Sequence, residues 1–134
     1  MATLIKNDRA AAYKGIDQDH QAIYESISRL SSMIGADHID GAAIKGDLDT
    51  LILNLSVMFK REENLMALIG YRHALSHSDH HAAAIREILF QMNKPSDGIA
   101  STCGNIISFL GNWVINHDKE HDRDLKVFMD QLNY

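Results

Sequence analysis

The chain has 134 residues, 46% of them hydrophobic, with a formal net charge of -5 and a pI near 5.8. This length predicts one domain over residues 1–134, and the acidic balance argues against a nucleic-acid partner, because nucleic-acid-binding domains usually carry a basic face. The chain has no apolar run of the length of a membrane span or a signal peptide, and its one cysteine, Cys103, excludes an internal disulfide. These features predict a cytoplasmic protein that does not enter the membrane.

Two amphipathic helices are predicted in the N-terminal half. The first covers residues 17–34, because apolar side chains recur there at steps of three and four residues, and an N-terminal arm precedes it. Asp17 is its expected N-cap and Gly35 its expected stop, since each residue type favours that end of a helix. The second covers residues 44–69 and ends at Gly70.

The C-terminal half predicts two more long helices and a short one. The third covers residues 74–92 and is broken at Pro95, which we expect in the first turn of the next helix. The fourth covers residues 99–117, and a short amphipathic helix follows at 125–132. Short loops force neighbouring helices to reverse direction, and no alternating run of residues indicates a strand. We therefore predict an all-α, up-down-up-down antiparallel four-helix bundle.

Metal-type side chains occupy the helix ends that such a bundle brings together. They lie at the start of the first helix, the end of the second, the start of the third and the end of the fourth: His20, Glu62, His77, His81, His117 and Asp122. A buried carboxylate such as Glu62 costs free energy unless it is paired or bound to metal. Nitrogen and carboxylate ligands together suit iron and other first-row metals, and bundles build dinuclear sites from facing helices. An ordinary hydrogen-bonded core residue is the alternative for each position taken singly.

Four stretches carry a resemblance to a known family. They are residues 16–20 (IDQDH), 59–66 (FKREENLM), 77–81 (HSDHH) and 113–122 (WVINHDKEHD). In order and spacing they resemble the hemerythrin family in its single-domain bacterial form, over essentially the whole chain. The resemblance implies a non-haem di-iron centre that binds dioxygen.

The resemblance also implies a role for each ligand. His77, His81 and His117 would hold the first iron, and His20 would hold the second, where dioxygen binds at an open position. Glu62 and Asp122 would bridge the two irons, together with an oxo or hydroxo group.

One position departs from the family's motif. Met58 stands where the family has a histidine ligand of the second iron. A thioether suits Cu(I) better than ferric iron, so we expect Met58 to fill space and not to bind metal. His20 would then be the only nitrogen ligand of the second iron. Water, Glu63, Asp19 or an exogenous anion could take the vacant position.

The leading interpretation is a ligand-binding metalloprotein that binds or senses dioxygen, a small anion or a related ligand. An alternative is a di-iron enzyme that turns over oxygen, peroxide or nitric oxide, because a missing histidine opens the site. A further alternative is a degenerate structural or interaction domain that binds one metal, zinc or none. Of the other side chains, we expect some exposed or next to the ligands (His73, His80, His121), some in a solvated rim (Asp118, Glu120, Asp124) and some in the core (Cys103, Trp113).

Overall fold

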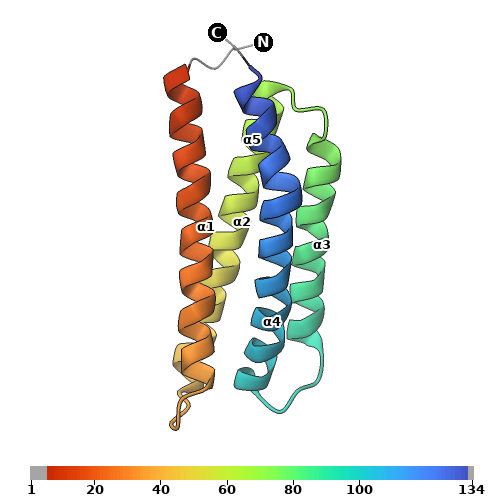
Figure 1. Cartoon of the computed structure of the whole chain (residues 1–134). Coiled ribbons are helices and arrows are strands. Elements are labelled where there is room, and N and C mark those ends of the chain that lie inside the picture. The colour runs from red at the N-terminus through yellow and green to blue at the C-terminus, as the bar shows by residue number, and fades with distance from the viewer. Residues whose placement is uncertain (1–5, 133–134) are drawn as a thin grey trace.

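The computed structural model describes residues 6–132, which form a bundle of antiparallel helices (Figure 1). Its elements are α1 (Lys6–Ile34), α2 (Gly41–Ile69), α3 (Ala74–Asn93), α4 (Ile99–His117), η1 (Asp118–Asp122) and α5 (Arg123–Asp130). Each long helix packs against its sequence neighbour, and α1 also packs against α4, which closes the bundle. Residues 6–132 contain no strand. The predicted all-α four-helix bundle with a short C-terminal helix is therefore confirmed.

Local sequence signals fix the ends of α2. The carboxylate of Asp40 accepts a hydrogen bond from the backbone N–H of Ala43 at 3.1 Å, so it satisfies a free donor of the first turn. Gly70 ends the helix in the left-handed conformation, at φ 67° and ψ 40°, which glycine adopts without steric cost. The predicted stop at Gly70 is confirmed.

Two predicted helix starts are wrong. Helix α1 begins at Lys6, so Asp17 is not an N-cap but lies within the helix, where its carboxylate pairs with Lys126 at 2.6 Å. Much of the expected N-terminal arm is therefore helical, and its residues 1–5 lie outside the described part of the chain. Pro95 does not begin α4, because that helix starts at Ile99 after Gly98, whose φ is 128°.

The last three elements form one continuous helix. The residues at both junctions, His117 and Asp118 at one and Asp122 and Arg123 at the other, have right-handed helical backbone angles. Between them η1 is a π-helix, whose turn is wider than that of an α-helix. The ribbon of α4 accordingly runs on into α5 without a break (Figure 1).

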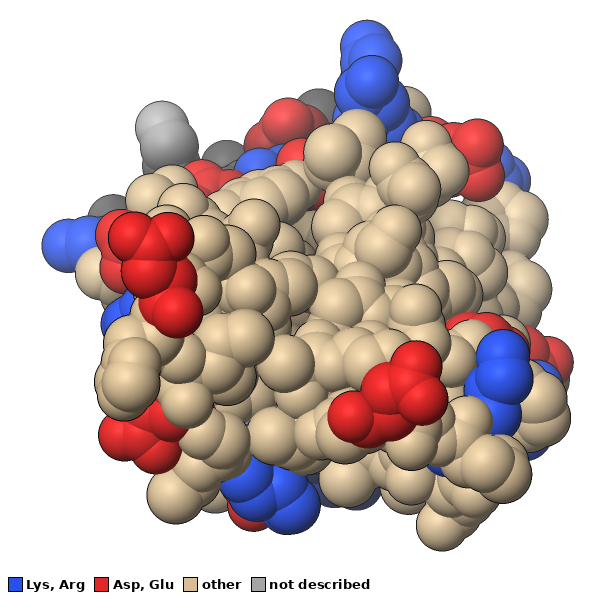
Figure 2. Space-filling model, turned by 90° about the horizontal axis from the view of Figure 1, so that it is seen from below, with Lys and Arg blue, Asp and Glu red and all other residues tan. Residues whose placement is uncertain are grey.

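The end of the bundle at which α1 joins α2 and α3 joins α4 has few charged side chains. Figure 2 looks at this end, where uncharged side chains cover most of the surface and the acidic and basic ones stand apart. No helix within residues 6–132 is long and apolar enough to cross a membrane.

Two apolar clusters are separated by a polar layer. The larger cluster includes Ile23 of α1, Phe59 of α2, Ala84 of α3 and Val114 of α4. The smaller one contains Ile16, Met66, Tyr71, Leu125 and Met129. Along α1 and α2 the buried histidine and carboxylate fall between members of these two clusters. The histidines of α3 follow Tyr71 of the smaller cluster and precede Ala84 of the larger one, and His117 falls between Val114 and Leu125. Packing on both sides therefore fixes the height of the polar layer in the bundle.

Two leucines of α2 provide a test of this packing. Leu51 is fully buried and Leu53 is 63% exposed. We expect Leu51→Ala to lower the free energy of unfolding by about 2–5 kcal/mol, because it leaves a cavity in the core. The matched control Leu53→Ala should change it by less than about 0.5 kcal/mol. Chemical denaturation of both variants measures the difference, and equal losses would contradict the packing of α2.

Candidate metal centre

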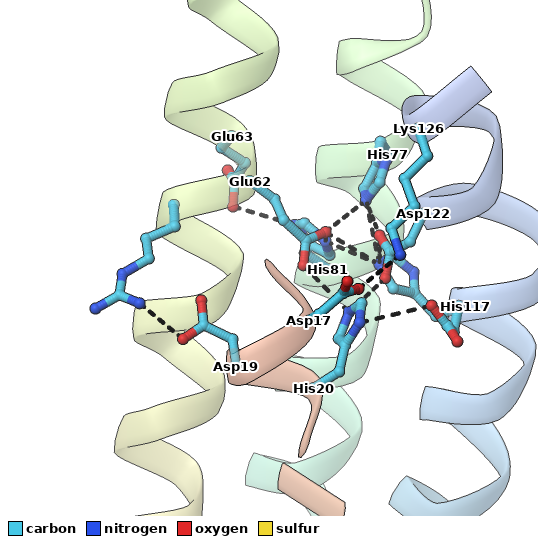
Figure 3. A network of polar contacts seen from close by, with 12 residues as sticks. Asp17, Asp19, His20, Glu62, Glu63, His77, His81, His117, Asp122 and Lys126 are labelled. Carbon is cyan, nitrogen blue, oxygen red and sulfur yellow. Dashed lines mark hydrogen bonds and ion pairs between the residues drawn. The ribbon is translucent and has the colours of Figure 1, made fainter. Parts of the chain in front are cut away.

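The structure brings all six metal-type side chains together in the polar layer (Figure 3). Helix α1 supplies one, α2 one, α3 two, α4 one and η1 one: His20, Glu62, His77, His81, His117 and Asp122. None is more than 6% exposed. The predicted convergence is therefore present, and the helix order explains it, since these positions lie towards the same end of an antiparallel bundle.

Three histidines direct one nitrogen each towards a common point. The Nε2 atom of His117 lies 3.1 Å from that of His77 and 3.1 Å from that of His81. Oε1 of Glu62 lies 3.0 Å from Nε2 of His77 and 3.2 Å from that of His81. Nitrogens that bind one metal at about 2 Å, at right angles, are about 3 Å apart. This half of the cluster could hold one metal ion.

Both carboxylates reach from the three histidines to His20. Oδ1 of Asp122 lies 3.2 Å from Nε2 of His77 and 3.1 Å from that of His117, whereas its Oδ2 lies 2.7 Å from Nε2 of His20. The two oxygens of Glu62 are arranged in the same way: Oε1 faces the three histidines, and Oε2 lies 3.7 Å from Nε2 of His20. Each carboxylate thus presents one oxygen to each half of the cluster.

Several of these close contacts are not aligned as hydrogen bonds. Nε2 of His20 and both carboxylate oxygens of Asp122 are buried without a hydrogen-bond partner within the described residues, although two of these atoms are only 2.7 Å apart. Oε2 of Glu62 is buried and unpartnered too. Buried polar groups are normally paired, so donor atoms that converge without pairing fit a bound cation. The residues present therefore suit a metal pair chemically.

The π-helix η1 brings Asp122 into the cluster. Asp122 follows His117 by five residues, which in an α-helix would turn its side chain about 140° away. In η1 the backbone N–H of Arg123 binds the carbonyl of Asp118, five residues earlier, and the wider turn places both side chains on one face. Their Nε2 and Oδ1 atoms are consequently 3.1 Å apart.

The buried carboxylates raise the pKa values of three of the neighbouring histidines, His20, His77 and His117. Burial lowers the pKa of His20, but contacts with Asp122 and Glu62 outweigh burial and raise it to about 10. The same opposing causes raise the pKa of His77 to about 9. Burial raises the pKa of Glu62 and of Asp122, yet their histidine partners bring both below the ordinary values. A metal ion would therefore compete with these protons.

The outer nitrogens of three histidines have partners outside the cluster. Nδ1 of His81 lies 3.2 Å from Glu63, Nδ1 of His117 lies 2.7 Å from His80, and Nδ1 of His20 lies 3.6 Å from Asp118. Nδ1 of His77 has no hydrogen-bond partner among the described residues. Such outer partners orient histidine ligands in metal sites. Asp118, predicted to lie in a solvated rim, is half-exposed, and its carboxylate also faces His20.

Two acidic residues considered for the vacant ligand position each have one partner. Glu63 lies 3.2 Å from the outer nitrogen of His81, and Oδ1 of Asp19 pairs with Arg61 at 2.7 Å (Figure 3). Oδ2 of Asp19 is buried without a hydrogen-bond partner among the described residues. Met58 is 1% exposed and belongs to the larger apolar cluster, one helical turn before Glu62. That it does not bind metal stays a prediction.

Comparison with known proteins agrees with the geometry. Curated hemerythrin-like proteins of Naegleria gruberi and Naegleria fowleri are each 24% identical to this chain over 111 residues, which is 83% of the chain and 80% of the relative. The chain is thus similar, over most of its length, to proteins named hemerythrin-like. No protein-family profile and no solved structure matches it. The hemerythrin-like relatives and the buried cluster together indicate a metal site, with iron the metal that the resemblance suggests.

The histidine pKa values predict how pH affects the stability of the chain when no metal is bound. The folded-state pKa values of His20 and His77, about 10 and about 9, exceed the ordinary 6.5. Each group therefore stabilises the fold fully below pH 6.5 and loses its contribution as the pH rises through its folded value. We expect the free energy of unfolding to fall over this range, as measured by denaturation of chelator-treated protein.

His20→Gln is the control for this measurement. The variant removes the group with the higher pKa, so it should flatten the upper part of the decline. A metal-free wild type that grows more stable as the pH rises from 6.5 to about 9 would contradict the assigned ion pairs.

Proposed function

We propose that this chain binds a pair of iron ions in the polar layer and uses them to bind or sense dioxygen or a related small ligand. The observation that supports this most strongly is the division of both carboxylates between the two halves of the cluster. In the proposal the three-histidine half, His77, His81 and His117, holds the first iron. His20 holds the second, and Glu62 and Asp122 bridge them.

The chemistry of the donor set favours iron over a structural zinc. Structural zinc sites are usually tetrahedral and rich in cysteine, whereas this cluster offers four imidazoles and two shared carboxylates. Cys103 is buried in the larger apolar cluster instead. The two relatives named hemerythrin-like support the same metal.

The surroundings of the cluster would protect a reduced centre. A ferrous pair bound there would supply the electrons that dioxygen accepts on binding. The chain's own contribution is to exclude water: apolar side chains pack above and below the polar layer, and Phe59 stacks on His81 with ring centroids 4.0 Å apart. Excluding water limits side reactions at a buried centre.

The His20 half is the place for an incoming ligand in this proposal. It has one histidine, against three in the other half, and His20 is the most exposed of the six side chains. The same asymmetry favours the second candidate, a di-iron enzyme that turns over oxygen, peroxide or nitric oxide. A dioxygen complex that persists for minutes supports binding, and one that decays at once with product release supports turnover.

Metal analysis with absorption spectroscopy tests the proposal directly. The protein is purified without oxygen, and its iron content and spectrum are recorded before and after exposure to air. We expect about two iron ions per chain and, after air, the near-ultraviolet bands of an oxo-bridged ferric pair. A protein that takes up one metal, zinc alone or none would overturn the di-iron proposal and favour the degenerate alternative.

The ligand assignment predicts a contrast between two histidines. His117→Ala removes a nitrogen at the centre of the three-histidine half and should lower iron affinity more than about tenfold. His73→Ala changes an exposed histidine whose ring lies against that of Tyr71, away from the cluster, and should leave iron content unchanged. Iron content after dialysis against graded chelator measures both. Equal losses would refute the assignment.

Met58 gives a sharper prediction. Because position 58 lies one turn before Glu62 on the buried face of α2, Met58→His should supply the second iron with another nitrogen. We expect a higher content of the second iron and weaker binding of azide, since the vacant position is filled. Iron analysis and azide titration measure these changes.

Val57→His is the matched control, because Val57 is the residue next to Met58 in the sequence but its side chain is 41% exposed. It should change neither the iron content nor the azide affinity. If Met58→His also changes neither, position 58 does not serve the second iron.

A further inference from the structure

His80 makes the shortest contact between the cluster and a side chain outside it. Its Nδ1 atom lies 2.7 Å from Nδ1 of His117, while Nε2 of His117 faces His77, His81 and both carboxylates. His80 is half-buried and is not one of the six converging residues. The contact therefore joins the back of a central histidine to a neighbouring helix, α3.

The two rings meet edge to edge. Their planes differ by 12° and their centroids are 5.0 Å apart, although the two nitrogens are only 2.7 Å apart. The nitrogens must then lie between the centroids, so the rings are nearly coplanar and not stacked on each other. A hydrogen bond in the plane of both rings points along the nitrogen lone pair, which is the favourable direction.

Two further rings cover this pair. The indole of Trp113 is nearly parallel to both imidazoles, with centroids 4.4 Å from His117 and 4.8 Å from His80. His121 is also nearly parallel to both, at 5.3 Å and 4.2 Å. Two such rings cannot occupy one face, so Trp113 and His121 cover opposite faces. The hydrogen bond is thereby held in plane and shielded on both sides.

This geometry selects one tautomer of His117. If Nε2 donates its lone pair to a cation in the cluster, the ring proton must be on Nδ1. That N–H then donates to Nδ1 of His80, which must be the unprotonated nitrogen of a neutral ring. Without an acceptor at this place, the proton of His117 could move to Nε2 and block the lone pair that faces the cluster.

We propose that His80 is a positioning residue that holds His117 in the tautomer able to bind metal. The role rests on the proposed metal-binding function and deepens it. Removing a hydrogen-bond partner of a histidine ligand typically lowers metal affinity by about 10–100-fold. A variant of His80 without a hydrogen-bond acceptor should therefore lose metal affinity, whereas a variant that lacks only the aromatic ring should keep it.

Two substitutions separate the acceptor from the ring. His80→Phe keeps an aromatic ring beside Trp113 and His121 but offers no acceptor. His80→Asn loses the ring but places an amide oxygen where Nδ1 of histidine stands. His73→Phe is the control, because it makes the same change at an exposed position of the same region, at the start of α3.

The experiment titrates the full metal-free chain with Co(II), followed by the visible absorption of the ion. We expect His80→Phe to weaken Co(II) binding by about 10–100-fold, and His80→Asn and His73→Phe to stay close to wild type. In the Zn(II)-loaded chain, long-range proton–nitrogen NMR should show the proton of His117 on Nδ1 in wild type and His80→Asn. That signal should be lost or shifted in His80→Phe. Thermal unfolding of the metal-free variants checks that each is folded.

The outcomes separate this role from the metal site itself. If wild type binds Co(II) and His80→Phe binds it equally well with an unchanged His117 signal, the role of His80 is wrong while the site stands. If His80→Asn is as weak as His80→Phe, the ring and not the acceptor matters, and the tautomer argument is overturned. If wild type binds neither Co(II) nor Zn(II), both the proposed function and this inference are wrong.

Discussion

The bundle depends on two carboxylates buried in its interior. Glu62 is fully buried and Asp122 is 1% exposed, and both remain ionised because their pKa values lie below the ordinary ones. A buried ionised carboxylate costs several kcal/mol unless opposite charge compensates it. His20, His77 and His117, whose pKa values are raised beside the carboxylates, supply that compensation from three helices. In the proposal all four histidines would supply it as metal ligands. The antiparallel order of the helices places these histidines and carboxylates at the same height in the bundle.

The same requirement explains why the fourth helix departs from α-helical geometry. A regular helix would turn Asp122 away from His117, and its charge would then lie against apolar neighbours or in solvent. The π turn at 118–122 rotates it inward, at the cost of a rarer backbone hydrogen-bond pattern. Beyond that turn the helix resumes, and Leu125 and Met129 close the apolar cluster at that end. The irregular backbone at 118–122 is thus what places Asp122 in the cluster.

Periodic apolar residues were enough to predict the bundle and the convergence of all six cluster residues, because burial and helix reversal follow from them. Gly70 marked the end of α2, whereas its start at Gly41 lies three residues before the predicted one. The start of α1 was missed, since residues 6–15 have no regular apolar face, and helix-favouring residues such as Arg9, Ala10 and Ala11 extend it instead. The π turn was not predicted either. Its signal was present in the five-residue spacing of His117 and Asp122, which an α-helix cannot place on one face.

The groups that contact the outer nitrogens of the cluster histidines could not be predicted from the sequence, because they depend on side-chain direction across helices. The two halves of the cluster differ in these partners. His117 has a short in-plane partner and His81 a charged one, whereas the carboxylate facing His20 stands 3.6 Å away, beyond hydrogen-bond length. The half with three histidines is therefore also the more firmly oriented half. Met58 adds an apolar side chain one turn below Glu62, so the His20 half lacks both a nitrogen and a close outer partner. Since Glu62 and Asp122 each have one oxygen in each half, a cation held by the three histidines would orient the carboxylates that the His20 half needs. In the proposed function the firmly oriented half would thus help to form the more open one.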